Sequence, residues 1–109
     1  MADSVFKGAI ATGTIEATLL SDSSNVDSDM VTISYAELGG GNPQVDQAVV
    51  VPGGSGHVRV SAPKKGVLEV LVATGHTTDS GRLSVSCDGA SVHDETIQGS
   101  AHWVYAVGA

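Results

Sequence analysis

The residues with the clearest chemical potential form an acidic segment between positions 21 and 29. It reads SDSSNVDSD and offers side-chain oxygens at Asp22, Asn25, Asp27 and Asp29. Calcium takes about six to eight oxygen ligands, and carboxylates in one loop can supply several of them. The helix–loop–helix calcium pattern does not fit, because no glycine stands in mid-loop and no glutamate closes it. These four residues are a candidate calcium site, with a solvated turn as the alternative.

Three other residue types could carry chemistry, but their spacing does not favour it. The four histidines, at positions 57, 76, 93 and 102, lack the short spacings typical of zinc sites. Ser55 stands two residues before His57, without the Gly-x-Ser-x-Gly elbow of a hydrolase nucleophile. Cys87 alternates with Leu83 and Val85, which predicts a buried and unreactive thiol. We therefore expect no enzymatic activity.

The chain contains only four aromatic residues apart from its histidines, and three of them are candidate ligand contacts. Trp103 and Tyr105 fall on one face of an alternating segment, and Tyr35 ends another. Exposed aromatic rings stack on sugars or anchor protein partners. The alternative is that Trp103 and Tyr105 close the hydrophobic core, and the scarcity of aromatic residues favours that alternative for Trp103.

The segments that would position these residues alternate between apolar and polar side chains. In residues 13–20, for example, Ile15, Ala17 and Leu19 share a face. This period of two indicates strands with one buried face. Residues 67–73 are apolar on both faces apart from Glu69, which suggests a central strand. The predicted strands cover 4–11, 13–20, 30–35, 45–51, 57–62, 67–73, 82–87, 91–97 and 101–107.

Turn residues separate these strands at short intervals, and Asp88-Gly89 suits a tight hairpin turn. We predict an all-β fold, an eight- or nine-stranded antiparallel β-sandwich of jelly-roll or Greek-key type. With 109 residues and no visible linker, residues 1–109 are predicted to form a single domain.

A weak internal repeat accompanies the strand pattern. The segment GTIE at Gly13 resembles GVLE at Gly66, 53 residues later, and residues 28–35 resemble residues 80–87, 52 residues later. Two related four-stranded halves would explain these matches, and so would convergence, since amphipathic strands look alike. If the halves are related, the strands that begin at Gly13 and Gly66 should occupy equivalent positions in a pseudo-two-fold sandwich.

Charge and composition limit the partners. The chain carries 12 acidic and 5 basic residues, a net charge of −7, and the basic residues are scattered. Nucleic acid is therefore an unfavourable partner, because binding it requires clustered lysine and arginine. No apolar run is long enough to span a membrane. A single cysteine and the absence of a recognisable signal peptide favour a cytoplasmic location over secretion.

Two functions remain as expectations. The first is a small acidic binding or assembly module, which acts through a protein partner or through self-association and carries no cofactor. The alternative is a carbohydrate-binding module or lectin, assisted by calcium at the acidic loop. The alternative requires exposed rings at Trp103, Tyr105 or Tyr35.

Overall fold

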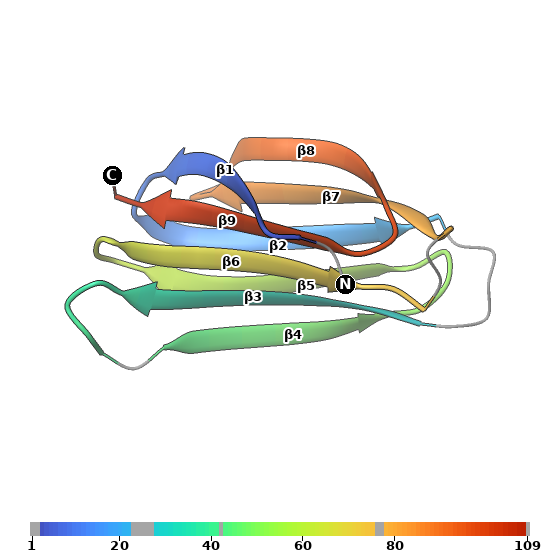
Figure 1. The fold of residues 1–109 in the computed structure, drawn as a ribbon, viewed down its shortest axis with the longest axis horizontal. Helices are drawn as coiled ribbons and strands as arrows, with labels where there is room; N and C mark the ends of the chain where they lie inside the picture. The colour runs from blue at the N-terminus through green and yellow to red at the C-terminus, as the bar shows by residue number, and fades with distance from the viewer. Residues whose placement is uncertain (1–2, 23–27, 42, 76–77, 109) are drawn as a thin grey trace.

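A computed structural model of the chain describes residues 3–22, 28–41, 43–75 and 78–108. Within them it contains nine strands and no helix (Figure 1). All nine predicted strands are present, and their ends lie within about two residues of the predicted positions. The strands are β1 (Val5–Ile10), β2 (Gly13–Ser21), β3 (Asp29–Glu37), β4 (Gln44–Val50), β5 (Ser55–Ala62), β6 (Gly66–Ala73), β7 (Ser80–Cys87), β8 (Ala90–Gln98) and β9 (Ala101–Val107).

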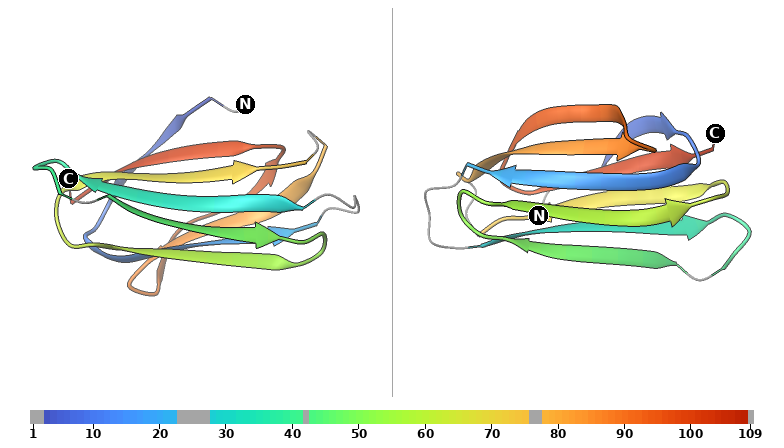
Figure 2. Two further views of the ribbon diagram at one scale, coloured as in Figure 1. Left: turned by 90° about the horizontal axis from the view of Figure 1, so that it is seen from below. Right: turned by 180° about the vertical axis from the view of Figure 1, so that it is seen from behind.

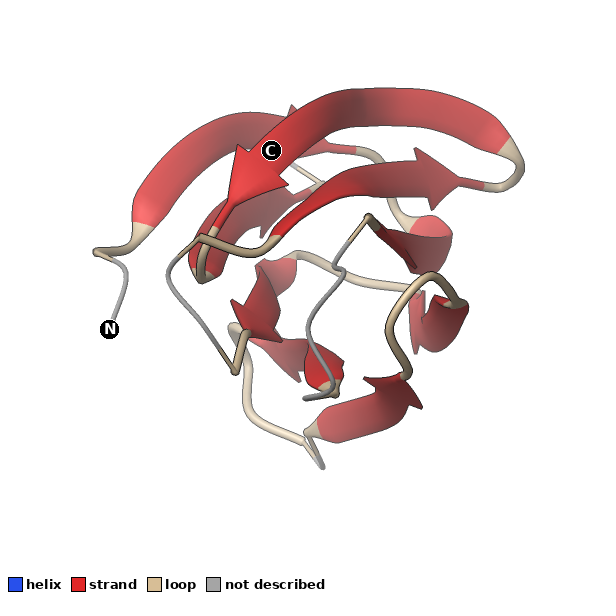
Figure 3. Cartoon of the chain, turned by 90° about the vertical axis from the view of Figure 1, so that its right-hand side faces the viewer, coloured by secondary structure: helices blue, strands red, loops and turns tan. Residues whose placement is uncertain are grey.

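The strands form two sheets that face each other across the core (Figure 3). Sheet A has the order β1-β9-β6-β3-β4, and sheet B has the order β5-β2-β7-β8. Only β3–β4 and β7–β8 are hairpins within a sheet, so the other connections pass from one sheet to the other. The predicted β-sandwich is therefore confirmed. One pair differs from the antiparallel prediction, because the edge strand β1 runs parallel to β9.

The two sheets repeat one pairing plan. Exchanging β2 with β6, β3 with β7, β4 with β8 and β5 with β9 converts the order β5-β2-β7-β8 into β9-β6-β3-β4. The registers agree as well, because Ile15 pairs with Cys87 and Leu68 pairs with Tyr35. These pairs are related by the two sequence offsets, 68 − 15 = 53 and 87 − 35 = 52. The prediction that the Gly13 and Gly66 strands are equivalent is confirmed. Two residues that this exchange converts into each other, one from each half of the chain, are called mates below.

Both of these glycines are required by close contacts. Gly13 has a φ of +147°, and a Cβ there would collide with the carboxylate of Asp88. That carboxylate accepts a hydrogen bond from the Thr14 amide at 2.9 Å. A Cβ on Gly66 would collide with the carbonyl oxygen of Ala36 in the neighbouring strand. A larger residue at Gly66 would displace the start of β6 from β3, whereas at Gly13 it would strain the backbone and push the Asp88 carboxylate from the Thr14 amide.

The inward faces of both sheets form one hydrophobic core. Ile15, Ile33, Leu68, Val70 and Val85 are among its fully buried members. Hydrophobic side chains from eight strands and the end of β1 meet there, which explains the strict alternation of the sequence. At one margin β4 and β5 close the sandwich side by side (Figure 2, left).

Candidate functional site

The acidic loop is only partly described, and its described carboxylates differ in their surroundings. Asp22 is exposed, whereas Asp29 is 4% exposed at the start of β3. Asn25 and Asp27 lie outside the described residues. Asp29 accepts a hydrogen bond from the Gly75 amide at 3.3 Å, and its side chain also hydrogen-bonds to that of Asp79. The structure thus pairs Asp29 with an acid that the sequence did not associate with it.

The Asp29–Asp79 pair has a clear electrostatic consequence. Both side chains are less than 5% exposed. Burial raises the pKa of Asp29, and the negative charge of Asp79 raises it further against the opposing hydrogen bond from Gly75. The surroundings of this pair therefore disfavour a negative charge on Asp29 beside Asp79. Among the described residues, no group of three or more His, Cys, Asp or Glu side chains is placed to hold a metal ion.

The described histidines lie in three different layers. His57 lies on the outer face of sheet B, where Nδ1 is 2.9 Å from Thr18 Oγ1 and Nε2 is 3.6 Å from Glu16. His102 lies on the outer face of sheet A, 2.8 Å from Glu69. His93 points into the interior from β8. These three histidines are therefore held apart by the fold, and His76 lies outside the described residues.

The three aromatic candidates belong to the core. Trp103 is 4% exposed, Tyr35 is 2% and Tyr105 is fully buried. Trp103 and Tyr105 face inward on β9, and Tyr35 donates a hydrogen bond from its hydroxyl to the carbonyl of Lys64 at 2.6 Å. The burial that the sequence favours for Trp103 is confirmed, and the exposed rings that the carbohydrate-binding alternative requires are not found at these three positions. In a chain with so few aromatic residues, these large side chains are needed to fill the interior.

A polar cluster surrounds Trp103 at the margin between β1 and β8. The Lys7 ammonium is 2.6 Å from Glu95 and 4.6 Å from the Trp103 ring centre. The His93 Nδ1 is 3.0 Å from the Tyr105 hydroxyl. Burial, followed by the charge of Glu95, raises the pKa of Tyr105, so this phenol stays protonated beside His93. The cluster fastens β1 to β8 and fixes the ring of His93.

The two candidate nucleophiles are Cys87, which is buried, and Ser55, which is exposed. The Cys87 thiol is buried and donates to the carbonyl of Ala11 at 3.4 Å. Burial, together with the nearby charge of Asp88, raises the pKa of this thiol, which disfavours the reactive thiolate. Ser55 lies at the exposed start of β5.

The outer face of sheet A is unusually apolar. Val45 and Val49 are each 61% exposed on β4, and Phe6 is 67% exposed on β1. Met30, Val67 and Leu71 are also exposed and project from the strands between them. Among the described strand residues on this face, Glu69 is the only carboxylate, and it is paired with His102. The apolar outer face, as we call it, comprises Phe6, Met30, Val45, Val49, Val67, Leu71 and Val104.

The outer face of sheet B has the opposite character at the same positions. The mates of Leu71, Met30 and Val49 are Thr18, Arg82 and Thr96. The mates of Val45, Val67 and Val104 are Ser91, Thr14 and Arg59. Arg82 makes two hydrogen bonds to Asp94 on this polar face. The shared strand plan therefore does not require the apolar side chains on sheet A.

The apolar outer face was missed as a candidate site, although the sequence carries a signal for it. Residues 67–73 are apolar on both faces, a pattern that also fits a central strand covered on both sides. In the structure β6 is central within sheet A, but only one face of that sheet packs on the core. The second apolar face of β6 is therefore left exposed in the single chain.

Comparisons with family models, with curated proteins and with solved structures found no match to this chain. In the described part of the chain, there is no helix of the length and apolar character needed to cross a membrane.

Proposed function

We propose that this protein is an assembly module that self-associates by packing the apolar outer face of one copy against that of another. The observation that carries the proposal is the contrast between mates. Six positions are apolar on the outer face of sheet A and polar on that of sheet B. The apolar side chains share this face with Thr32, Ser34 and Gln47, which lie between some of them. Exposed apolar area concentrated on one face is a feature of protein interaction sites.

Charge supports a second copy as the occupant. The chain carries a net charge of −7, so two copies repel each other over most of their surfaces. Among the described strand residues of the apolar outer face, Glu69 is the only carboxylate, and it lies 2.8 Å from His102. Packing two such faces together therefore brings almost no like charge into contact. A two-fold arrangement would place the same patch on both sides of the interface.

The size of the face is consistent with a stable dimer. Five strands at about 4.8 Å spacing and about seven residues at 3.3 Å each cover a flat area of about 550 Å². Projecting side chains enlarge the accessible area beyond this flat value. Standard interfaces bury about 800 Å² per partner, so the two areas are of the same order. Stacked sheets with small aliphatic side chains pack well at about 10 Å separation.

The test is sedimentation velocity over a concentration series with two matched variants. Leu71 is 37% exposed at the centre of the apolar outer face, and Leu20 is 46% exposed on a central strand of the opposite sheet. We expect Leu71→Glu to abolish association and Leu20→Glu to leave it intact. A wild-type chain that stays monomeric at every concentration would reject the proposal. Equal effects of both substitutions would show that the interface is elsewhere.

A further inference from the structure

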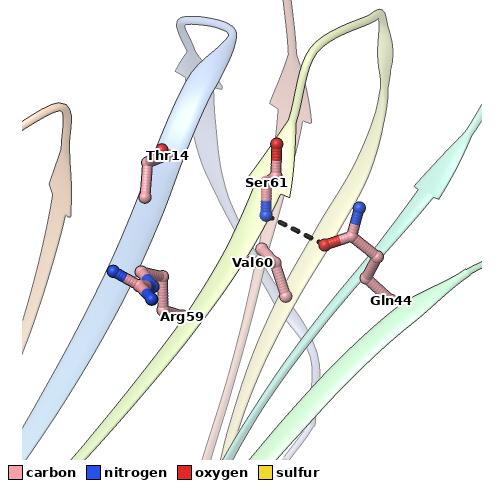
Figure 4. Close-up of a pocket in the computed structure, with 5 residues that line it drawn as sticks. All are labelled: Thr14, Gln44, Arg59, Val60 and Ser61. Atoms are coloured by element: carbon pink, nitrogen blue, oxygen red, sulfur yellow. Dashed lines mark hydrogen bonds between the residues drawn. The ribbon is translucent and has the colours of Figure 1, made fainter.

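A small hollow lies where β4 approaches the free edge of β5. It has a volume of about 350 Å³ and is lined by Thr14, Gln44, Arg59, Val60 and Ser61 (Figure 4). This volume is at the lower end of the range of about 300–1,000 Å³ seen in ligand sites. The hollow lies along the edge of sheet B, away from the apolar outer face of sheet A, so the two surfaces can be tested independently.

The pairing plan shows what occupies the equivalent position in the other half. Arg59, Val60 and Ser61 pair with Glu16, Ile15 and Thr14. Their mates on β9 are Val104, Tyr105 and Ala106, which pair with Glu69, Leu68 and Val67. In that half the edge is covered, because Phe6, Gly8 and Ala9 of β1 run parallel along those three residues. The hollow is therefore the counterpart of the β1 position, without a strand in it.

Side chains of β4 satisfy the backbone amides that face this hollow. The Arg59 amide donates to Asp46 Oδ2 at 3.0 Å, and the Ser61 amide donates to Gln44 Oε1 at 2.9 Å. Figure 4 shows the second of these bonds. Two side-chain oxygens thus stand where the carbonyl groups of a neighbouring strand would be. Both bonds are at the surface, so water can replace them at little cost when the side chains move away.

No remaining segment of the same half can fill this position. β1 precedes β2 through Ala11 and Thr12, and the residues that precede β6 in the same way already form β5. Among the described residues of this half, none is left to form a strand at this edge. Backbone pairing at an exposed edge is a general mode of peptide recognition, in which alternate side chains enter pockets.

We propose that the β5 edge is an acceptor for an extended peptide segment of a partner protein, which binds parallel to β5 after the start of β4, with Gln44 and Asp46, moves away from that edge. The segment should carry an apolar side chain opposite Val60. β1 has Gly8 at the corresponding place opposite the much larger Tyr105. Valine leaves room there for a side chain that tyrosine does not. Carbonyl groups of the peptide backbone accept hydrogen bonds from the Arg59 and Ser61 amides.

The probe is a synthetic peptide with the sequence SVFKVAIA. This is residues 4–11 of this chain, the strand that fills the equivalent position, with valine in place of Gly8 to supply the apolar side chain opposite Val60. Binding is followed by amide chemical-shift changes in the full chain. We expect saturable shifts centred on the Arg59 and Ser61 amides, with a Kd of about 1 mM or tighter, corresponding to about 4 kcal/mol. The same peptide with proline in place of both its phenylalanine and its first alanine should not bind, since the corresponding Phe6 and Ala9 are paired residues of β1 and proline interrupts strand pairing.

Two protein variants sharpen the test. Gln44→Ala combined with Asp46→Ala removes the competing oxygens and should tighten binding about tenfold. Ser61→Pro removes one of the two amide donors at an edge that tolerates proline, and should weaken binding at least tenfold. If Ser61→Pro does not fold, the alanine pair alone decides the matter. Absence of saturable shifts in the alanine pair, or shifts centred on Val104 and Ala106 through exchange with β1, would overturn the proposal. Neither variant should change sedimentation, which depends on sheet A.

Discussion

The outer faces of the two sheets differ far more than their inner faces. Mates inside the sandwich are alike, as with Ile15 and Leu68 or Ile33 and Val85, because both must fill one dry core. Outside, Leu71 corresponds to Thr18 and Met30 to Arg82. Water solvates both outer faces of the single chain equally, so stability alone would make both polar. The difference is the basis for the proposal that a second copy covers the outer face of sheet A.

One outer feature is nevertheless shared by both sheets. Glu69 and His102 are 2.8 Å apart on sheet A, and their mates Glu16 and His57 are 3.6 Å apart on sheet B. The pair therefore belongs to the common plan and does not distinguish the two faces. Only the apolar residues around it do so, and the strongest predictions concern them.

The largest expected effect comes from exchanging the two outer faces. Replacing Leu71, Met30 and Val49 by the side chains of their mates gives Leu71→Thr, Met30→Arg and Val49→Thr. If each lost contact costs about 0.5 kcal/mol, the six lost in a symmetric dimer weaken association about 100-fold. Sedimentation velocity measures this change.

The reciprocal exchange is the control for the face exchange. The variant with Thr18→Leu, Arg82→Met and Thr96→Val makes sheet B apolar at the same positions. We expect it to associate more strongly than the wild-type chain. The outer faces do not control assembly if the variant of sheet A associates as well as the wild-type chain and the variant of sheet B associates no more strongly than it.

The strands were predictable from sequence because each position in them obeys a strict alternation. The pairing plan was predictable in part, because Gly13 and Gly66 mark mates whose close contacts permit no side chain. The parallel addition of β1 was not predictable, since residues 4–11 have no feature that distinguishes an edge from an inner strand. Strand order is set by long-range packing, which local periodicity does not record.

The candidate site was predicted less well for a related reason. Trp103 and Tyr105 alternate in the sequence as they would on either a buried or an exposed face. Their burial depends on which sheet covers β9, and that follows from the fold. Asp29 was named only as one of four candidate calcium ligands, and its partner Asp79 comes from a loop about 50 residues away. Neighbours in sequence could not identify that pair.

A second, smaller effect is expected at Asp29, whose mate on sheet B is Gly81. The folded pKa of Asp29 is raised above its ordinary value, so its contribution to stability is complete below about pH 3.8 and is lost as pH rises through the folded pKa. Asp29→Asn mimics the protonated form at every pH. We expect it to stabilise the fold at pH 7 by about 1 kcal/mol, or about 5 °C in Tm.

Urea unfolding of both proteins between pH 7 and pH 3 checks this prediction for Asp29. The advantage of Asp29→Asn should shrink as the pH falls, because the wild-type carboxyl then gains its own proton. Asp22→Asn, which alters an exposed acid of the same segment, serves as the control. A variant that is less stable than wild type at pH 7 would show that ionised Asp29 stabilises the fold.

The smallest effect is expected at Tyr35 and its mate Cys87, which each donate a hydrogen bond to the turn between two strands. The Tyr35 hydroxyl donates to the Lys64 carbonyl at 2.6 Å, and the Cys87 thiol donates to the Ala11 carbonyl, the mate of Lys64, at 3.4 Å. A hydroxyl is the stronger donor, so Tyr35→Phe should cost about 1 kcal/mol in urea unfolding. Cys87→Ser should change stability by less than about 0.5 kcal/mol, because the stronger bond offsets the lost apolar burial. A larger loss for Cys87→Ser than for Tyr35→Phe would mean that packing, not hydrogen bonding, holds the β1–β2 turn.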